Sequence, residues 1–438
     1  MRFKKLLIMP VLIALCMCLC GCELFAFNTE ELVSPPALTG DMYPIGQALA
    51  DSAGDNYTLK YPTSGDRRSA VILEDINSDG LFEAFAFYST SDDETTMMHI
   101  NVICQRNGKW VSAADQSIAA VGVERVDFCD IDGDGTKEIL AGWEIYGSSE
   151  KQLSVYTFTQ NTFTQRLLQQ YTGFLCGDID GNGENEIFIH LLNASVPENK
   201  AGIYTFHEGG IQQTAGCVMD SNVKTASEPM LSTLSTGERA IYIDEIKGIG
   251  AITEVLCFSK GELINPLLDM ENSLENTGTL RAASLSCKDI NVDGILEIPV
   301  ASDLPSADGG TENLYYTNWC SFNGETLTVK MITIVNTIDG YYLTLPNRMV
   351  GKIAVSKDTA NHRRVFYAYD ADKGAVGERL FSITAYDIKK WEGDGADGSN
   401  IVEIYRNDTT VFAASVNMVQ TTFPITAEEI KEMFKMVE

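Results

Sequence analysis

Short runs of alternating apolar and polar residues recur along most of the chain, and turns rich in Gly, Asn and Asp separate them. Between residues 125 and 168, four such runs follow one another, "RVDFCD", "KEILAGWE", "QLSVYTFT" and "TFTQRLL", with Gln160 and Asn161 at the last turn. Runs of this length that are rich in Val, Ile, Tyr, Phe and Thr predict strands, and short turns between them predict antiparallel pairing. A four-stranded antiparallel sheet is therefore expected here.

The same plan of four strand-like runs recurs in residues 69–115, 173–217 and 283–335, with Asn-Gly or Gly-Gly at the turn between the third and fourth runs. Repeats of about 45–65 residues with four strands each are typical of propeller blades. A single blade leaves both faces apolar, so neighbouring blades must stack on one another. The sequence therefore predicts a mainly β chain in which residues 45–338 form a β-propeller of about five recognisable four-stranded units.

An acidic loop lies between the first and second runs of four units: "EDINSDGLFEAF" at 74–85, "CDIDGDGTKEIL" at 129–140, "GDIDGNGENEIF" at 177–188 and "KDINVDGILEIP" at 288–299. Each copy has the form D-x-[DN]-x-[DN]-G-x-x-E. Oxygen side chains at positions 1, 3, 5 and 9 can surround one cation if the glycine at position 6 permits a sharp turn, and such hard ligands suit Ca²⁺.

These loops differ from EF-hands, which need a bidentate glutamate at position 12 and a following helix. Position 12 holds Ala86, Ala141, Ile189 or Val300, and strand-like residues follow each loop. For any one copy the alternative is a solvated Asp-Gly turn without metal. Four copies in the same frame favour metal binding, and about four Ca²⁺ sites are expected.

The spacing of the loops predicts one further unit. The first three copies start 55 and 48 residues apart, and the fourth starts 111 residues after the third, which is about two periods. "RAIYIDEIKGIGAITEVLCF" lies in this gap and keeps Asp244, but Ile246 and Gly248 stand where ligands would be. We interpret it as a degenerate copy without metal.

The pattern changes after about residue 339. Strand-like runs continue there without acidic loops, and "DADKG" at 370–374 lacks the loop spacing and predicts a turn. The chain then reads "ITAEEIKEMFKMVE", in which Thr426 and Glu429 form a capping box at the start of a helix. The apolar residues on one face of this helix are Ile430, Met433, Phe434 and Val437. Residues 339–438 are therefore expected to form a separate small α+β domain.

The N-terminal sequence "MRFKKLLIMPVLIALCMCLCGCELF" has three early cations and an apolar run from Leu6 to Cys20 that contains Pro10. This pattern is typical of an export signal rather than a spanning helix. The end of the run, Leu19-Cys20-Gly21-Cys22, resembles the bacterial lipobox.

That resemblance implies that residues 1–21 are a lipoprotein signal peptide and that Cys22 carries a lipid. Residues 22–44 would then form a lipid-anchored tether, and the protein would be extracytoplasmic and anchored to a bacterial membrane. The alternative is an ordinary cleaved signal with incidental cysteines.

The charge balance excludes one class of partner. Lys and Arg total 32 against 61 Asp and Glu, which gives a formal charge of −29. Such a surface repels phosphate backbones, so no nucleic-acid partner is expected, and it attracts cations. The cysteines after residue 22 show no disulfide pattern, and Cys129, Cys176 and Cys287, just before acidic loops, are expected to be small buried strand residues.

The loop D-x-D-x-D-G-x-x-D/E between two strands resembles the FG-GAP or VCBS-type repeat of integrin α-chain propellers and many bacterial surface proteins. The resemblance covers about two-thirds of the chain. It implies a propeller whose calcium ions brace the rim of the blades, seldom take part in chemistry and have a structural role. The calcium ligands that it implies are Asp75, Asn77, Asp79 and Glu83; Asp130, Asp132, Asp134 and Glu138; Asp178, Asp180, Asn182 and Glu186; and Asp289, Asn291, Asp293 and Glu297.

The sequence favours a binding protein over an enzyme. It contains no HExxH, GxSxG, Walker or dinucleotide-binding sequence, and His99 and His190 lie within strand-like runs. Our leading hypothesis is a calcium-stabilised surface lipoprotein that binds or scaffolds an extracellular protein or glycan partner. The alternative is a cell-surface glycan hydrolase on a propeller scaffold, with structural calcium and an acid pair among the many carboxylates.

Overall fold

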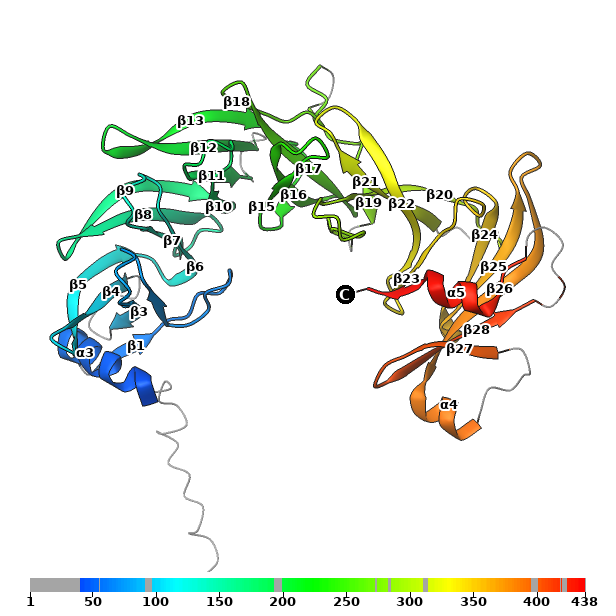
Figure 1. Cartoon of the computed structure of the whole chain (residues 1–438), viewed down its shortest axis with the longest axis horizontal. Helices are drawn as coiled ribbons and strands as arrows, with labels where there is room; N and C mark the ends of the chain where they lie inside the picture. Colours follow the sequence, from blue (N-terminus) through cyan, green and yellow to red (C-terminus); the bar gives the residue numbers. More distant parts are fainter. Residues whose placement is uncertain are drawn as a thin grey trace, which may run out of the picture. The chain divides into compact units, whose positions relative to one another are not determined.

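The computed structural model describes residues 40–54, 56–90, 97–192, 199–271, 274–282, 285–309, 314–394, 401–417, 419 and 424–437 (Figure 1). The predicted signal peptide, Cys22 and residues 22–39 of the predicted tether lie outside this part. The chain is mainly β, with 56% strand and 8% helix, and its strands form several small antiparallel sheets. These proportions and sheets are consistent with a propeller-like fold.

Sheet I follows a helix that the sequence did not predict. The chain turns through η1 (Gly40–Met42) into α3 (Tyr43–Ala53), where Ile45, Ala48 and Leu49 share one buried face. This face packs on the sheet because the i, i+3, i+4 spacing aligns the three side chains. The strands of sheet I are β1 (Tyr57–Leu59), β2 (Val71–Glu74), β3 (Glu83–Thr90), β4 (Met97–Arg106) and β5 (Lys109–Ala119).

Sheets II and III are four-stranded meanders in which each strand pairs with the next. Sheet II contains β6 (Gly122–Cys129), β7 (Glu138–Glu144), β8 (Lys151–Thr159) and β9 (Thr162–Tyr171). Sheet III contains β10 (Gly173–Gly177), β11 (Glu186–Leu191), β12 (Lys200–His207) and β13 (Gly210–Val218). The four strand-like runs between residues 125 and 168 are thus confirmed as one sheet.

Sheet IV is irregular. Its strands are β14 (Thr225–Ala226), β15 (Met230–Thr233), β16 (Arg239–Lys247), β17 (Gly250–Ser259), β18 (Glu262–Ile264) and β19 (Arg281–Ala282). The long hairpin β16–β17 has one face packed with sheet III and the other packed with sheet V. Both of its strands are therefore buried over most of their length.

Sheet V begins as a third meander and extends beyond the expected boundary at residue 339. Its strands are β20 (Ile298–Leu304), β21 (Leu314–Phe322), β22 (Leu327–Asn336), β23 (Tyr341–Thr344) and β29 (Phe434–Met436). Two strands from the range 339–438 thus complete the sheet of the preceding unit.

Sheet VI carries the helices of the C-terminal part. Its strands are β24 (Ile353–Asp358), β25 (Arg363–Asp370), β26 (Ala375–Asp387), β27 (Ile401–Arg406) and β28 (Thr410–Val416), and η2 (Thr359–Asn361), α4 (Ile388–Asp394) and α5 (Ala427–Met433) accompany them. Sheets V and VI share one hydrophobic core. The core of residues 339–438 therefore extends into the preceding unit through Leu304, Tyr316 and Ile334.

The C-terminal helix is shorter than predicted. The Thr426 side chain caps it by accepting a hydrogen bond from the Glu429 N–H (3.2 Å), as the capping box predicts. The helix ends at Met433, and Phe434 continues as β29 instead of sharing the helical face. The Phe434 ring stacks on the Tyr341 ring, with 5.0 Å between the ring centroids.

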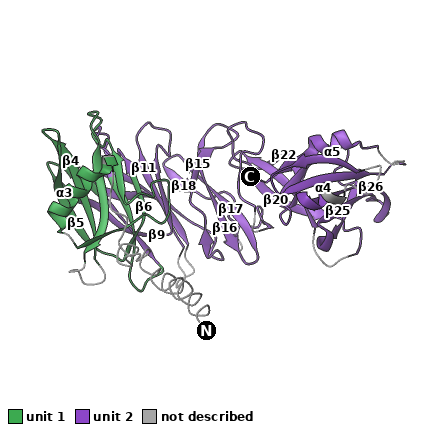
Figure 2. Cartoon of the chain, turned by 90° about the horizontal axis from the view of Figure 1, so that it is seen from below, with its two compact units in different colours: residues 1–127, 139–149, 156–164 green, residues 128–138, 150–155, 165–438 purple. Residues whose placement is uncertain are grey.

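The chain divides into two compact units, drawn in green and purple in Figure 2. The first comprises residues 1–127, 139–149 and 156–164, and the second comprises 128–138, 150–155 and 165–438. The division passes through sheet II. None of the helices in the described part is both long and apolar enough to cross a membrane.

Candidate metal-binding loops

The four acidic loops occupy similar places, each directly before a strand that belongs to one of the sheets: β3, β7, β11 and β20. We number them loop 1 (75–83), loop 2 (130–138), loop 3 (178–186) and loop 4 (289–297). In every loop the glutamate at position 9 is directed back across the loop and accepts a hydrogen bond from the backbone N–H of position 2. These bonds join Ile76 to Glu83 (3.4 Å), Ile131 to Glu138 (2.8 Å), Ile179 to Glu186 (2.8 Å) and Ile290 to Glu297 (3.2 Å).

The position-6 glycine has the conformation that the sequence requires. Its φ is positive in all four loops: 85° at Gly80, 88° at Gly135, 93° at Gly183 and 87° at Gly294. L-residues with a side chain rarely adopt this conformation. Position 4 also has a positive φ, which suits the glycines of loops 2 and 3 but falls on Val292 in loop 4, at 62°.

Loops 2 and 3 bring three carboxylates together. Oxygen atoms of Asp130, Asp132 and Glu138 lie within 4.8 Å of one another, and so do those of Asp178, Asp180 and Glu186. Within the described residues, these are the two acidic groups that converge in this way. The other predicted ligand of loop 2, Asp134, accepts a hydrogen bond from the Thr136 N–H (2.7 Å).

Loops 1 and 4 arrange their side chains differently because position 3 is asparagine. The Asn77 amide donates to Asp79 Oδ2 (3.1 Å) in loop 1. The Asn291 amide donates to Asp293 Oδ2 (2.9 Å) and to Glu297 Oε1 (3.1 Å) in loop 4. These amide donors occupy carboxylate oxygens that a cation would need, so each amide would have to turn before an ion could bind.

The closing glutamates are costly to ionise without a cation. Burial, together with the like charges of the loop aspartates, raises the pKa of Glu138 to about 7. The same causes raise the pKa of Glu83, Glu186 and Glu297. Glu138 Oε1 is buried and has no hydrogen-bond partner among the described residues. An ion bound by loop 2 would give this oxygen a partner, so the loop 2 residues fit Ca²⁺.

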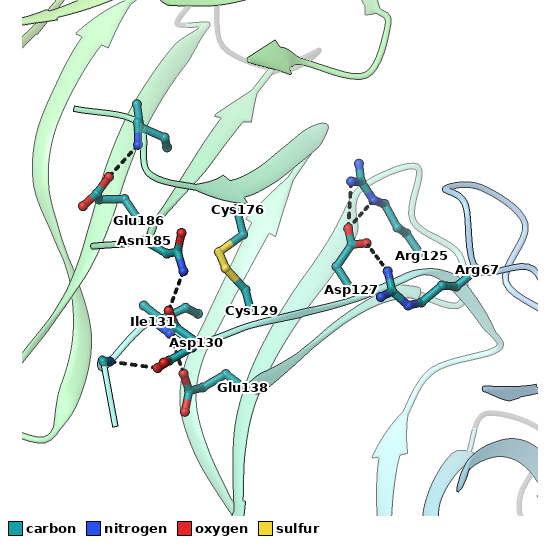
Figure 3. The surroundings of a disulfide bond; sticks show 12 residues. Arg67, Arg125, Asp127, Cys129, Asp130, Ile131, Glu138, Cys176, Asn185 and Glu186 are labelled. Atoms are coloured by element: carbon teal, nitrogen blue, oxygen red, sulfur yellow. Dashed lines mark hydrogen bonds and ion pairs between the residues drawn. A yellow bond between two sulfur atoms is a disulfide. The ribbon is translucent and has the colours of Figure 1, made fainter. Parts of the chain in front are cut away.

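A disulfide joins the sheets that carry loops 2 and 3 (Figure 3). Cys129, at the end of β6, is bonded to Cys176 in β10, which corrects the expectation that both are free buried cysteines. Each half-cystine lies one or two residues before the first aspartate of a loop. The Asn185 amide adds a second link by donating to the carbonyl oxygen of Asp130 (2.8 Å). The two convergent loops are thus tied together by a covalent bond and a hydrogen bond.

The degenerate copy is aligned differently from our prediction. The segment equivalent to the acidic loops is the turn at 234–238, between β15 and β16, whereas Asp244 lies within β16. Asp244 is buried and paired with Arg281 (2.5 Å). Arg239, at the start of β16, extends to loop 3, where it pairs with Asp178 Oδ2 (3.1 Å) and hydrogen bonds to the Asp178 carbonyl oxygen.

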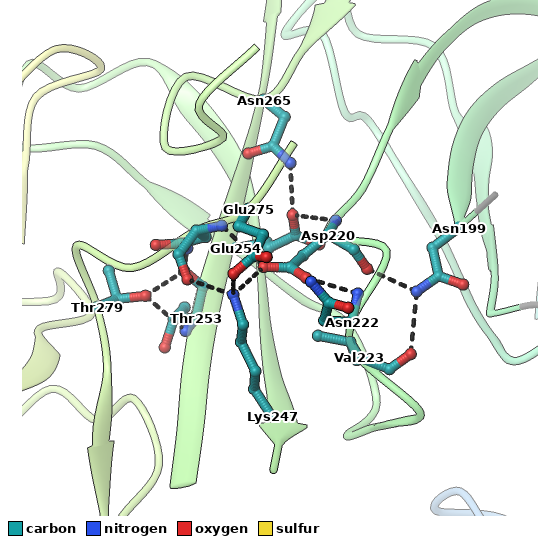
Figure 4. A network of polar contacts seen from close by, with 11 residues as sticks. Asn199, Asp220, Asn222, Val223, Lys247, Thr253, Glu254, Asn265, Glu275 and Thr279 are labelled. Carbon is teal, nitrogen blue, oxygen red and sulfur yellow. Dashed lines mark hydrogen bonds and ion pairs between the residues drawn. The ribbon is translucent and has the colours of Figure 1, made fainter. Parts of the chain in front are cut away.

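Sheet IV contains a buried polar network that the sequence did not predict (Figure 4). Lys247 pairs with Asp220 and Glu275, each at 2.8 Å. Glu254 Oε1 accepts hydrogen bonds from the Asp220 N–H (2.9 Å) and from the Asn265 amide (2.6 Å). These residues come from distant parts of the sequence, so no local pattern identified them.

Two acids of this sheet form a pair. Glu245 and Glu254 lie within hydrogen-bond reach of one another, and burial, then their mutual repulsion, raises the pKa of Glu245 far above its usual range. Their side chains are 1% and 0% exposed. Both carboxyl groups are therefore enclosed, and a polysaccharide could not reach between them.

His190, which lies within a strand as expected, and Trp143 belong to the core. Both are fully buried, and burial lowers the pKa of His190 to about 3. His99 lies in β4 and pairs with Asp115 at 2.7 Å.

No protein-family model matches the chain, and no curated protein matches it either. Solved structures with similar folds include a rhamnogalacturonan lyase from Bacillus licheniformis, at 10% identity and a TM-score of 0.31 over 85% of this chain and 93% of that one. A periplasmic gluconolactonase from Pseudomonas aeruginosa shows 14% identity and a TM-score of 0.32 over 75% and 89%. The Dos1 propeller shows 7% identity and a TM-score of 0.30 over 83% and 81%. At these scores none of the three indicates what this chain does.

Proposed function

We propose that this chain is a calcium-stabilised binding or scaffolding protein whose sheets form an FG-GAP/VCBS-like propeller, held at a bacterial surface by a lipid on Cys22. The observation that supports calcium binding is the pair of three-carboxylate groups in loops 2 and 3, each closed by a buried glutamate. Carboxylates that converge around a buried glutamate are stable as anions only with a cation among them.

Loops 2 and 3 would be the stronger sites. The carboxylates of loop 2 are already gathered, whereas Asn77 and Asn291 must reorient before loops 1 and 4 can bind. Loop 3 shares Asp178 with Arg239, a cation that competes with calcium for the same oxygen. The proposed order of affinity is therefore loop 2, then loop 3, then loops 1 and 4.

The first test is a thermal melt in millimolar Ca²⁺ and in metal-free buffer, with metal content measured on the same protein. An ion that binds only the folded state at about 100 times its Kd stabilises it by about 2.7 kcal/mol. Two to four bound ions and a clear rise in Tm are expected. A protein that binds no calcium and melts at the same temperature in both buffers would refute the proposal.

Single substitutions identify the sites. Asp130→Asn removes a charge from loop 2. It should lower the calcium content by about one ion and abolish most of the rise in Tm that calcium binding to loop 2 provides. Asp370→Asn is the matched control, because Asp370 is an exposed aspartate in the "DADKG" turn and pairs only with Lys373 among the described residues. A calcium content that is unchanged in Asp130→Asn would contradict the assignment of loop 2.

The binding role is proposed over the glycan-hydrolase alternative because one acid pair outside the four loops, Glu245 and Glu254, is enclosed in sheet IV. Screening the protein against a polysaccharide panel separates the two. Turnover that a single Asp or Glu substitution outside the four loops abolishes would establish the hydrolase. Metabolic labelling with a fatty acid, compared between the wild-type chain and Cys22→Ser, tests the anchor.

A further inference from the structure

Two arginines that have no acidic partner among the described residues lie on the polar face of sheet VI. Arg363 starts β25 and Arg379 lies in β26, and both line a cavity of about 490 Å³ together with Ser382, Thr384 and Lys390. We call this cavity the arginine pocket. The opposite face of the same strands packs into the hydrophobic core through Phe366 and Phe381, so the pocket has a rigid floor.

The strand register explains why these polar side chains gather. Arg363 is opposite Thr384, and Ser382 is opposite Ser415 on β28. Side chains at alternate positions of paired strands lie on one face of a sheet. The Arg379 guanidinium lies over this row and donates to the Ser382 hydroxyl (3.0 Å) and the Ser415 hydroxyl (3.1 Å).

No acid of the described residues neutralises the charges of the two arginines. Neither guanidinium has a carboxylate of this part of the chain within 4.0 Å, and the Arg363 guanidinium donates no hydrogen bond there. The Nε atoms of both are buried without a partner. Burial lowers the pKa of Arg379, and the positive charge of Arg363 lowers it further, which shows that the two charges repel. Asp387 also lines the pocket, but its side chain accepts from the Lys389 and Lys390 N–H groups at the start of α4.

This arrangement is unusual for so acidic a chain. With 61 acids and 32 basic residues, almost any cation can find a carboxylate partner. Arg406, on the edge strand of the same sheet, forms ion pairs with two carboxylates, those of Glu403 and Glu392. A buried donor without a partner costs free energy, and like charges side by side add to that cost. Both costs disappear when an anion with two or more oxygens binds between the arginines, because guanidinium groups hold such anions through paired hydrogen bonds.

We propose that the arginine pocket binds a small organic anion through a carboxylate, sulfate or phosphate group held by Arg363 and Arg379. The volume exceeds that of an inorganic ion and falls in the range of small-molecule sites. The hydroxyls of Ser382, Thr384 and Ser415 provide hydrogen-bonding groups for the rest of a polar molecule. The site lies outside the acidic loops, and its occupancy does not depend on calcium.

The test is a calorimetric titration of the full chain with three probes: sodium sulfate, inorganic phosphate and sodium glucuronate. The protein is first freed of metal on a chelating resin, and the sulfate and glucuronate titrations are repeated in millimolar Ca²⁺. Saturable binding of at least one probe is expected in both states, and the tightest probe identifies the anionic group. Because the overall charge repels anions, saturable binding indicates a local site.

Arg363→Met and Arg379→Met should each weaken binding of that probe by about tenfold or more. Arg363→Lys keeps the charge but cannot form the paired hydrogen bonds, so its loss of affinity should be smaller than that of Arg363→Met. Lys373→Met is the matched control, because Lys373 lies in the β25–β26 turn, is exposed and pairs with Asp370. It should bind as the wild type does.

Melts without added anion separate binding from a structural role. Removing one of two repelling charges should leave the Tm of the empty protein unchanged or raise it. Two results would overturn the proposal: no saturable binding of any probe up to millimolar concentration, or binding that both methionine substitutions leave unchanged. Failure of calcium binding would leave this result unaffected, so the two proposals fail separately.

Discussion

Removing the Cys129–Cys176 disulfide should destabilise the protein substantially. The change is the double substitution Cys129→Ala and Cys176→Ala, which leaves both loop sequences intact. The bond joins residues 47 positions apart in sheets II and III, and both half-cystines are half-buried, so little apolar contact is lost with the sulfur atoms. Most of the effect is therefore expected from the greater freedom of the unfolded chain.

The chain-entropy relation gives the size of this effect. A cross-link that closes a loop of 47 residues lowers the entropy of the unfolded state enough to stabilise the fold by about 4 kcal/mol at 25 °C. Measured losses on removing native disulfides are typically about 2–5 kcal/mol. We expect the double variant to lose about 2–4 kcal/mol of unfolding free energy, with the link from Asn185 to Asp130 retained.

The assay is urea unfolding of the wild type and the double variant, each with and without a reductant. The control is Cys104→Ala with Cys217→Ala, which removes two half-buried free cysteines. Reductant should lower the stability of the wild type to that of the variant and leave the variant unchanged. A double variant within about 1 kcal/mol of the wild type would refute the reasoning, as would alkylation of Cys129 and Cys176 in the unreduced, unfolded chain.

The remaining predictions concern single residues. In the folded protein His190 stays neutral until the pH falls to its pKa of about 3. In the unfolded chain the same imidazole binds a proton below about pH 6.5. The unfolding free energy should therefore fall by about 1.4 kcal/mol per pH unit as the pH falls from about 6.5 towards 3. His190→Leu should remove this contribution, which corresponds to the uptake of about one proton on unfolding, in melts measured across that range. Val292 is exposed in loop 4 and has a positive φ, a conformation that Asn tolerates better than Val. Val292→Asn should therefore raise the unfolding free energy of the protein by about 1 kcal/mol. Val329→Asn, on strand β22, should give no such gain in urea unfolding, and a loss of stability in Val292→Asn would contradict the strain at this position.

The sequence predicted features whose signals are local. The four acidic loops fold alike because position 6 must be glycine for the chain to turn, and that requirement is visible in the sequence. The strands around them follow from runs of β-branched and aromatic residues. The hairpin turn at Asn107-Gly108 has both φ angles positive, as an Asn-Gly sequence between strands predicts.

Features that depend on distant partners were missed. Constant spacing placed the degenerate loop at Asp244, but a shorter turn at 234–238 shifted the alignment by several residues. Nothing local distinguishes Cys129 from a free cysteine, because its partner lies in the next sheet. Phe434 continues a helical pattern in sequence, and its stacking on Tyr341 makes it part of a strand.

The candidate sites show the same contrast. The ligand types could be read from the sequence, including the Asp at position 3 of loops 2 and 3 and the Asn at position 3 of loops 1 and 4. The hydrogen bonds that the Asn77 and Asn291 amides donate could not. The sequence did not predict the arginine pocket. Arg363 and Arg379 are brought together only by the pairing of β25 with β26, and their lack of acidic partners among the described residues can be seen only in the structure.

Strand β29 determines the order in which the C-terminal part can fold. β20, β21 and β22 pair with their neighbours in sequence and can form early as hairpins. β23 pairs with β22 along one edge and with β29 along the other. All strands of sheet VI lie between β23 and β29 in the sequence, so the second edge of β23 stays unpaired until β29 arrives. Pairing across such a distance is slow, and an unpaired edge can recruit strands from other molecules. During folding, β23 is thus a point at which one chain can associate wrongly with another, and β29 removes that risk only at the final step.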